Sequence, residues 1–452
     1  KRDAFNLSQD QDMVDIMIEK LDNIVLKDST YADALSTRSL YMLLKFWYGG
    51  FWNKPESDEG QTLIKSLIND CELALKYDRT NTLALTTIPI AQMIHIWTIP
   101  KITGKIFTAR KALVGINDLK EQYPEHYMTS FAIGMYHRLR SRMASLSRET
   151  DYDDAVKLLG KSTDQSGKGI KNNMSDPMVK LIHEESMKQL SYYQETYSDY
   201  SDALFYYNSL HGLYKKEGKV ERLASVIEKQ MEVFALVGDF ESSLDKAIYL
   251  EKTANQISGN DDKKNWYKYT SMLGVANAYI KLGEAQMGLE LIQEIDTSNI
   301  SKANAGMNAN FDYDLLYTLA LIGVDDKRNA IMYINRSIKN TEKIINNVKG
   351  NEWHLYLARG NKLYAQAILS GLLIDSGDID LAKKILKNVE IDIEKQIRPM
   401  YQFSVETPFK LHLAYNSISK NEIGAKYLSI AKNEMIRISD VLNDANKKTY
   451  LE

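Results

Sequence analysis

A small side chain recurs along most of this chain at intervals of 40 to 52 residues, and this period restricts the fold more than any other feature. The stretch from Met272 to Ile295 shows what surrounds each recurrence. Two segments with apolar residues at helical spacing meet there at a short turn, Leu282-Gly283-Glu284. Helices joined so tightly must lie antiparallel, and the small side chains of Ala276 and Gly288 let their backbones approach closely. The stretch therefore predicts a helical hairpin.

The recurring residue marks an equivalent point in every predicted hairpin. The markers are Leu67, Ala112, Ala155, Ala203, Ser243, Gly288, Ala330, Ala382 and Ala425, with Leu67 the weakest member. One hairpin cannot bury both of its faces, so consecutive hairpins must stack on one another. We therefore expect an all-α fold, an α-solenoid of about nine antiparallel helical hairpins.

The hairpin at 272–295 resembles the tetratricopeptide-repeat (TPR) family, in a long-period form similar to that of bacterial signalling and effector proteins. The resemblance rests on small residues at the helix crossing, Tyr279 in the first helix, the turn at Gly283, and Pro124 at a junction between units. It covers nearly the whole chain. It implies a TPR-like superhelix whose concave face is lined by the first helix of each hairpin.

Four segments are predicted along the chain. Residues 1–31 form an entry helix, 32–176 are N-terminal TPR-like hairpins with an apolar concave face, 177–398 are central TPR-like hairpins, and 399–452 are a C-terminal hairpin with a capping helix. Residues 160–176 are rich in Gly, Ser, Lys and Asn, which predicts the longest polar loop.

Charge and cysteine content exclude several classes of protein. The formal net charge of −3 gives no electrostatic basis for nucleic-acid binding by this segment. The single cysteine, Cys71, excludes an internal disulfide framework and is interpreted as a buried core thiol. No apolar run reaches the ~18 residues of a membrane span. The arginines Arg138, Arg140, Arg142 and Arg148 cannot share one helical face, so we interpret them as mostly solvated.

The chain does not begin with Met, so we expect a mature form or a fragment whose upstream part is missing. A cytoplasmic location is favoured. A periplasmic or envelope location follows if an upstream signal or membrane segment has been removed.

Catalytic and metal-binding patterns are not found. The seven histidines form no His-x-x-x-His pair, and the sequence holds no Gly-x-Ser-x-Gly elbow and no glycine-rich turn for a dinucleotide. We therefore expect no catalytic residues, no metal and no cofactor, and we interpret the chain as a binding protein and not an enzyme.

The family's concave positions, carried onto this sequence by the repeat phase, give the candidate ligand-binding or partner-binding residues. They are Leu40, Leu43, Leu44, Ile90, Met93, Ile94, Phe131, Met135, Arg138, Tyr192, Glu195, Glu228 and Glu232. Further along, the same phase places on the inner face Ser225, Ala235 and Leu236, then Thr270, Leu273, Asn277, Ile280 and Lys281, and then Asp312, Leu315, Leu319 and Ile322. The face is apolar in the first three hairpins and acidic in the fourth and fifth.

Two interpretations of the apolar wall stay open. Its residues are core if the early hairpins curl tightly or the Phe51-Trp52 loop folds inward. They are a binding groove if the wall is exposed. The functional hypothesis is a non-catalytic TPR-like scaffold or sensor that binds a protein, peptide or small ligand in its concave groove, as part of a bacterial signalling or regulatory protein. The alternative is a stand-alone cell-envelope protein that encloses an apolar small molecule.

Overall fold

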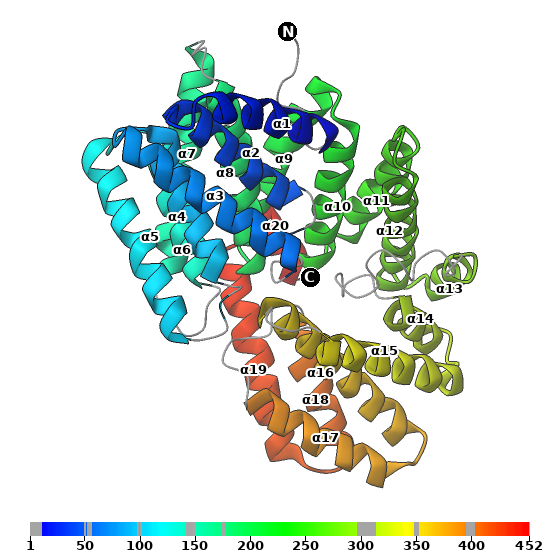
Figure 1. Cartoon of the computed structure of the whole chain (residues 1–452). Coiled ribbons are helices and arrows are strands. Elements are labelled where there is room, and N and C mark those ends of the chain that lie inside the picture. The colour runs from blue at the N-terminus through cyan, green and yellow to red at the C-terminus, as the bar shows by residue number, and fades with distance from the viewer. Residues whose placement is uncertain are drawn as a thin grey trace. The chain divides into compact units, whose positions relative to one another are not determined.

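The computed structural model describes residues 11–48, 51, 57–96, 99, 102–141, 148, 150–172, 177–295, 313–347, 352–394 and 403–451. Within these ranges the regular structure consists of twenty helices and no strand. Helices that follow one another in sequence pack side by side along most of the chain (Figure 1). This confirms the prediction of an all-α solenoid built from helical hairpins.

The chain divides into two compact units, Lys1–Tyr193 and Gln194–Glu452. The first unit contains α1 (Gln11–Lys27), α2 (Ala32–Tyr48), α3 (Asp58–Tyr77), α4 (Thr82–Ile96), α5 (Ile102–Gln122), α6 (Tyr127–Ser141) and α7 (Asp151–Lys171). Helix α8 (Pro177–Thr196) continues across the boundary. The predicted division at residues 31, 176 and 398 stays a prediction.

The second unit continues the alternation of helices. It contains α9 (Tyr200–Glu217), α10 (Val220–Leu236), α11 (Phe240–Ala254), α12 (Asp261–Lys281), α13 (Ala285–Gln293), α14 (Tyr313–Gly323), α15 (Lys327–Asn347), α16 (Glu352–Asp375), α17 (Ile379–Glu394), α18 (Glu406–Ser417), α19 (Asn421–Asp440) and α20 (Asp444–Leu451). Between α1 and α20, the described helices therefore form nine consecutive pairs.

The first helix, α1, packs onto the first hairpin. Val14 and Leu21 of α1 are buried in one cluster with Leu40 and Leu44 of α2. Their spacing places them on one face of α1, which is the apolar stripe expected of a helix with one buried side.

The turns within the six pairs from α8–α9 to α18–α19 each contain a residue with a left-handed backbone. Gly283 has a left-handed φ of 90°, and the N–H of Glu284 donates to the carbonyl of Tyr279 at 2.8 Å. This bond satisfies a carbonyl at the end of α12 that the helix itself leaves unpaired. Gly238 and Gly377 repeat this geometry with φ of 80° and 84°, and Ser198, Asp325 and Ser419 adopt it with φ of 64°, 60° and 60°. The predicted turn at Gly283 is therefore present.

Small residues lie where paired helices cross. A Cβ atom on Gly288 would lie 2.6 Å from Cγ1 of Ile280 and 3.0 Å from the carbonyl oxygen of Ala276. Ala203 and Ser243 are fully buried at equivalent points. In the last hairpin the marker was misplaced by one residue. Ala425 is exposed, and Gly424 is the buried residue, with the carbonyl oxygen of His412 3.3 Å from the place of its missing Cβ.

The predicted polar loop at 160–176 was wrong over most of its length, because α7 continues to Lys171. Ser162 and Ser166 lie on one buried face of α7, where their hydroxyls donate to the carbonyls of Tyr127 and Ser162 at 3.0 and 2.6 Å. Ser186 of α8 donates to the Ser162 hydroxyl at 3.0 Å. Short hydroxyl side chains allow close packing here without an unpaired polar group. Residues 173–176 lie outside the described ranges.

The end of the chain returns to the beginning of the second unit. The N–H of Asn443 and the side-chain amide of Asn446 both donate to the hydroxyl of Ser201 in α9, at 2.9 and 3.3 Å. Thr449 of α20 lies next to Gly238, with its carbonyl oxygen 3.5 Å from the place of the missing Cβ. The last helix was predicted as a cap, and it contacts helices that precede it by about 240 residues.

Candidate functional site

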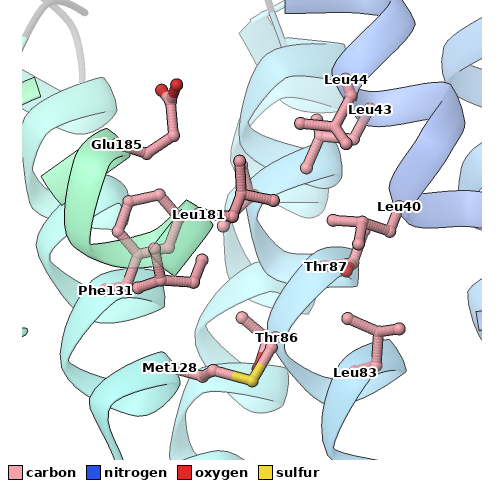
Figure 2. Close-up of a pocket in the computed structure, with 12 residues that line it drawn as sticks. Leu40, Leu43, Leu44, Leu83, Thr86, Thr87, Met128, Phe131, Leu181 and Glu185 are labelled. Atoms are coloured by element: carbon pink, nitrogen blue, oxygen red, sulfur yellow. The ribbon is translucent and has the colours of Figure 1, made fainter. Parts of the chain in front are cut away.

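The residues of the predicted apolar wall come together in the first unit, and they are buried. Leu40, Leu43 and Leu44 of α2, Ile90, Met93 and Ile94 of α4, and Phe131 and Met135 of α6 are each at most 7% exposed. Figure 2 shows the leucines of α2 facing Phe131 and Leu181 across a cavity. Of the predicted residues, Leu40, Leu43, Leu44, Ile90 and Phe131 line this cavity.

The cavity between them is small. It leaves about 20 Å³ for the centre of a water-sized sphere, which is room for one or two water molecules. Pockets for small-molecule ligands are commonly larger than about 300 Å³ in total volume. In this conformation the wall is packed like a core, and its role as a ligand site stays a prediction. Trp52, which the core interpretation also invoked, lies outside the described residues.

A carboxylate lines this apolar cavity. Glu185 of α8 is 2% exposed, and its Oε2 accepts from the amide of Gln189 at 3.4 Å. Its Oε1 has no hydrogen-bond donor among the described residues, and the ammonium of Lys188 lies 3.9 Å away.

The arginines of α6 were predicted to be mostly solvated, and for Arg138 and Arg140 this was wrong. The guanidinium of Arg140 is bonded to both oxygens of Asp151, which is fully buried and also contacts Nδ1 of His137 at 2.9 Å. Arg138 is 3% exposed and lies over the ring of Tyr192 at 5.8 Å. Burial raises the pKa of Asp151, but hydrogen bonds from Arg140, His137 and the Arg148 backbone outweigh it and hold this pKa below its usual value. These bonds of Arg140 and His137 to Asp151 connect the end of α6 to the start of α7, and we call them the clamp. Arg142 lies outside the described residues.

The acidic part of the predicted inner face lies at the start of the second unit. Glu195, Glu228 and Glu232 are 2%, 9% and 1% exposed. The ammonium of Lys229 lies 2.6 Å from Oε2 of Glu232 and 3.4 Å from Oε1 of Glu195. The hydroxyl of Tyr207 donates to Oε2 of Glu195 at 2.5 Å. We call Glu195, Glu228 and Glu232 the carboxylate cluster.

Burial in this cluster changes the protonation of one member. Burial raises the pKa of Glu228 to about 8, and the carboxylates of Glu232 and Glu195 add to this rise. Lys229 and a hydrogen bond from Trp266 act in the opposite direction and are weaker. The cluster therefore holds more acid groups than its cationic surroundings keep ionised at neutral pH.

A second cavity lies on the inner face of the same unit, and we call it the inner cavity. It leaves about 60 Å³ for the centre of a water-sized sphere. Six of its lining residues were named from the repeat phase: Ala235, Leu236, Asn277, Lys281, Leu315 and Leu319. They come from α10, α12 and α14. The predicted inner positions of three hairpins therefore meet at one cavity.

The inner cavity combines an apolar floor with polar groups. Asn277 is 6% exposed, and its side chain lines this cavity. Lys281 and Glu406 line the same cavity and are exposed to solvent. The rings of Tyr364 and Phe403 stack beside it, with centroids 4.0 Å apart.

Sequence reasoning did not name Phe240, Leu316, Tyr364, Phe403 or Glu406 as lining residues. The eighth and ninth hairpins supply three of them, and inner positions had not been assigned there. Tyr364 and Glu406 could have been predicted by applying the repeat phase to the segments that form α16 and α18.

The described residues contain no group of three or more histidine, cysteine or carboxylate side chains that could hold a metal ion. Cys71 is fully buried, and burial raises the pKa of its thiol to about 12. This confirms its interpretation as a core thiol, because a protonated buried thiol is a poor nucleophile. None of the helices in the described ranges has the length and apolar character that crossing a membrane requires.

Comparisons with known proteins identify no relative by sequence. No protein-family model matches the chain, and no curated protein matches it. Among solved structures, NprR in complex with its cognate peptide NprX is similar at 11% identity and a TM-score of 0.45, over 85% of this chain and 96% of that one. A circular tandem repeat protein is similar at 12% identity and a TM-score of 0.16, over 97% and 87%. Both are helical-repeat proteins, and the likeness concerns the fold alone.

Proposed function

We propose that this chain is a non-catalytic, TPR-type binding protein, and that the inner face of its second unit binds an extended peptide segment of a partner. The observation that carries the proposal is the position of Asn277, whose amide side chain lines the inner cavity beside the leucines of α14. A role in bacterial signalling, which the family resemblance implies, would follow from such binding.

A peptide backbone fits an amide in the cavity wall better than an apolar molecule does. A hydrogen bond between a ligand and such an amide contributes about 0.5–1.5 kcal/mol, so a ligand that pairs with it gains affinity. The Asn277 side chain offers a donor and an acceptor, and each peptide group offers the complementary acceptor and donor. The leucines of α14 form an apolar surface beside it, where a side chain of the same peptide can be buried.

The experiment is a selection of random 12-residue displayed peptides on the immobilised full chain. Recovered peptides are then measured against Asn277→Leu, which keeps the size of the side chain and removes its hydrogen-bonding groups. We expect affinity to fall about tenfold or more, because one buried hydrogen bond contributes on the order of 1.4 kcal/mol. The control is Asn335→Leu, at an exposed position of α15.

Asn277→Leu should fold about as stably as the parent, since it places an apolar side chain of similar size at a position that is 6% exposed. Recovered peptides that bind both proteins equally would show that the inner cavity is not the site.

A further inference from the structure

We propose, building on the function above, that the bound peptide carries an arginine or lysine side chain that enters the carboxylate cluster, about three residues from an apolar side chain that fills the inner cavity. The partner is thus a peptide segment with a basic residue and an apolar residue at fixed spacing.

The carboxylate cluster and the inner cavity lie along one line on the facing sides of α10 and α12, and we call this line the track. On α10, Glu228, Glu232 and Ala235 are spaced by four and three residues, so they share one face of the helix. At 1.5 Å of rise per residue, Glu228 and Ala235 are separated by about 10 Å along the axis. An extended peptide covers about 10 Å with three residues. This sets the expected spacing.

The neighbouring helix α12 places two polar side chains, Thr270 and Asn277, along the same track. Thr270 is 1% exposed, and its hydroxyl has no hydrogen-bond partner within the described parts of the chain. It lies two turns before Asn277 on the same face of α12. Tyr267, one turn before Thr270, interacts electrostatically with Glu228. Thr270 therefore lies at the acidic end of the track and Asn277 at the cavity end.

The charges of the cluster complement a cation. The Lys229 ammonium is 26% exposed and contacts the buried carboxylates of Glu195 and Glu232, and its charge also acts on the buried carboxyl of Glu228. Tyr207 and Trp266 fix Glu195 and Glu228 by hydrogen bonds, so the acceptors are held in position. A metal ion is the weaker candidate, because the described residues include no group of three metal-ligand side chains. A guanidinium or ammonium group can bond to two carboxylates at once.

The energetic consequence is a large preference for a basic residue. Burial is the main cause of the raised pKa of Glu228, and the neighbouring carboxylates of Glu232 and Glu195 add to it. A cation that enters between Glu228 and Glu232 would offset the repulsion between these buried carboxylates. Hydrogen bonds to charged groups then favour the basic peptide about 10- to 100-fold over a neutral one of the same shape.

The experiment uses the peptides selected on the full chain and their synthetic variants. Each selected sequence is made with its basic residue and again with citrulline, which keeps the shape of arginine and removes its charge. Binding is measured by titration calorimetry against the parent, Glu228→Gln, and the control Glu241→Gln at an exposed position in the first turn of α11. We expect enrichment of Arg or Lys about three residues from an apolar residue. The citrulline forms should bind about tenfold or more weaker to the parent.

Glu228→Gln should reduce the difference between the arginine and citrulline forms, whereas Glu241→Gln should leave it unchanged. Peptides that depend on Asn277 but show no basic residue, or whose citrulline forms bind equally well, would overturn this inference and leave the proposed function standing. If no selected peptide depends on Asn277, the proposed function fails and the inference falls with it. The citrulline comparison needs only the parent protein, so it decides the question even if Glu228→Gln does not fold.

Discussion

Adding one methyl group at Gly288 tests the close helix crossing from which the repeat was recognised. In Gly288→Ala the new Cβ would lie 2.6 Å from Cγ1 of Ile280 and 3.0 Å from the carbonyl oxygen of Ala276. The Ile280 side chain can rotate, but the backbone carbonyl can move only with α12. The two helices must therefore separate slightly.

The magnitude follows from comparison with a glycine in open space. Gly212 lies within α9, in the same unit, and a Cβ there would meet no atom within 4 Å. Gly212→Ala should stabilise the unit by about 0.5–1 kcal/mol, because alanine loses less backbone entropy in a helix. Gly288→Ala gains a similar amount but adds an overpacking cost of about 1–3 kcal/mol. The propensity gain cancels in the difference, so the two variants should differ by about 1–3 kcal/mol.

Urea unfolding followed by circular dichroism measures both variants and the parent. We expect the midpoint of Gly212→Ala to rise above that of the parent, and the midpoint of Gly288→Ala to lie below that of Gly212→Ala. Unchanged slopes would show that stability alone has changed. If Gly288→Ala is stabilised as much as Gly212→Ala, the crossing is not close and the alignment of hairpins on small residues is wrong.

Three further predictions address the turn, the clamp and the carboxylate cluster. Ser419→Gly should stabilise the last hairpin by about 1 kcal/mol in thermal unfolding, since glycine adopts the left-handed φ of 60° without the penalty of a Cβ atom; an unchanged midpoint would contradict the backbone geometry. Asp151→Asn should destabilise the first unit by about 3–5 kcal/mol because it leaves Arg140 buried with a neutral partner, and urea titration checks this. The Asp151 pKa is lowered, so its contribution is present above an unfolded-state pKa of about 3.9 and is lost as the pH falls below it. For Glu228 the pKa is raised to about 8, so the protonated carboxyl stabilises the fold fully below about pH 4.5 and loses this effect as the pH rises through 8. Relative to Glu228→Gln, the parent should lose up to about 1.4 kcal/mol per pH unit in that window, and parallel pH profiles would refute the shift.

The architecture could be predicted because helical phase is a local property of the sequence. Spacing of apolar and small residues identified the hairpins and placed Asn277 and Leu319 on the inner face. The same spacing could not distinguish an exposed groove from a packed one, since both require apolar residues at Phe131 and Met93. Burial at these positions depends on how far successive hairpins rotate.

Polar side chains led to wrong predictions of solvent exposure where they are short enough to pack in a helix interface or where their partners are distant in sequence. The serines of α7 looked like a loop, although short hydroxyl side chains also suit a closely packed helix face. Arg140 looked solvated because its partner, Asp151, lies 11 residues away in the sequence, beyond the end of the same helix, α6. The stacked rings of Tyr364 and Phe403 belong to different hairpins. The residue spacing within one hairpin therefore could not predict this contact.

The bonds between Ser201 and the segment that begins α20 fix an order of events during synthesis. Asn443 follows Ser201 by 242 residues, so the ribosome completes almost the whole second unit before this contact can form. At about 5–20 residues per second, the interval is roughly 12–50 s. Throughout that time the face of α9 that later receives α20 is open to chaperones and to other nascent chains. The junction can therefore form only after α20 has left the exit tunnel, long after α9 has folded.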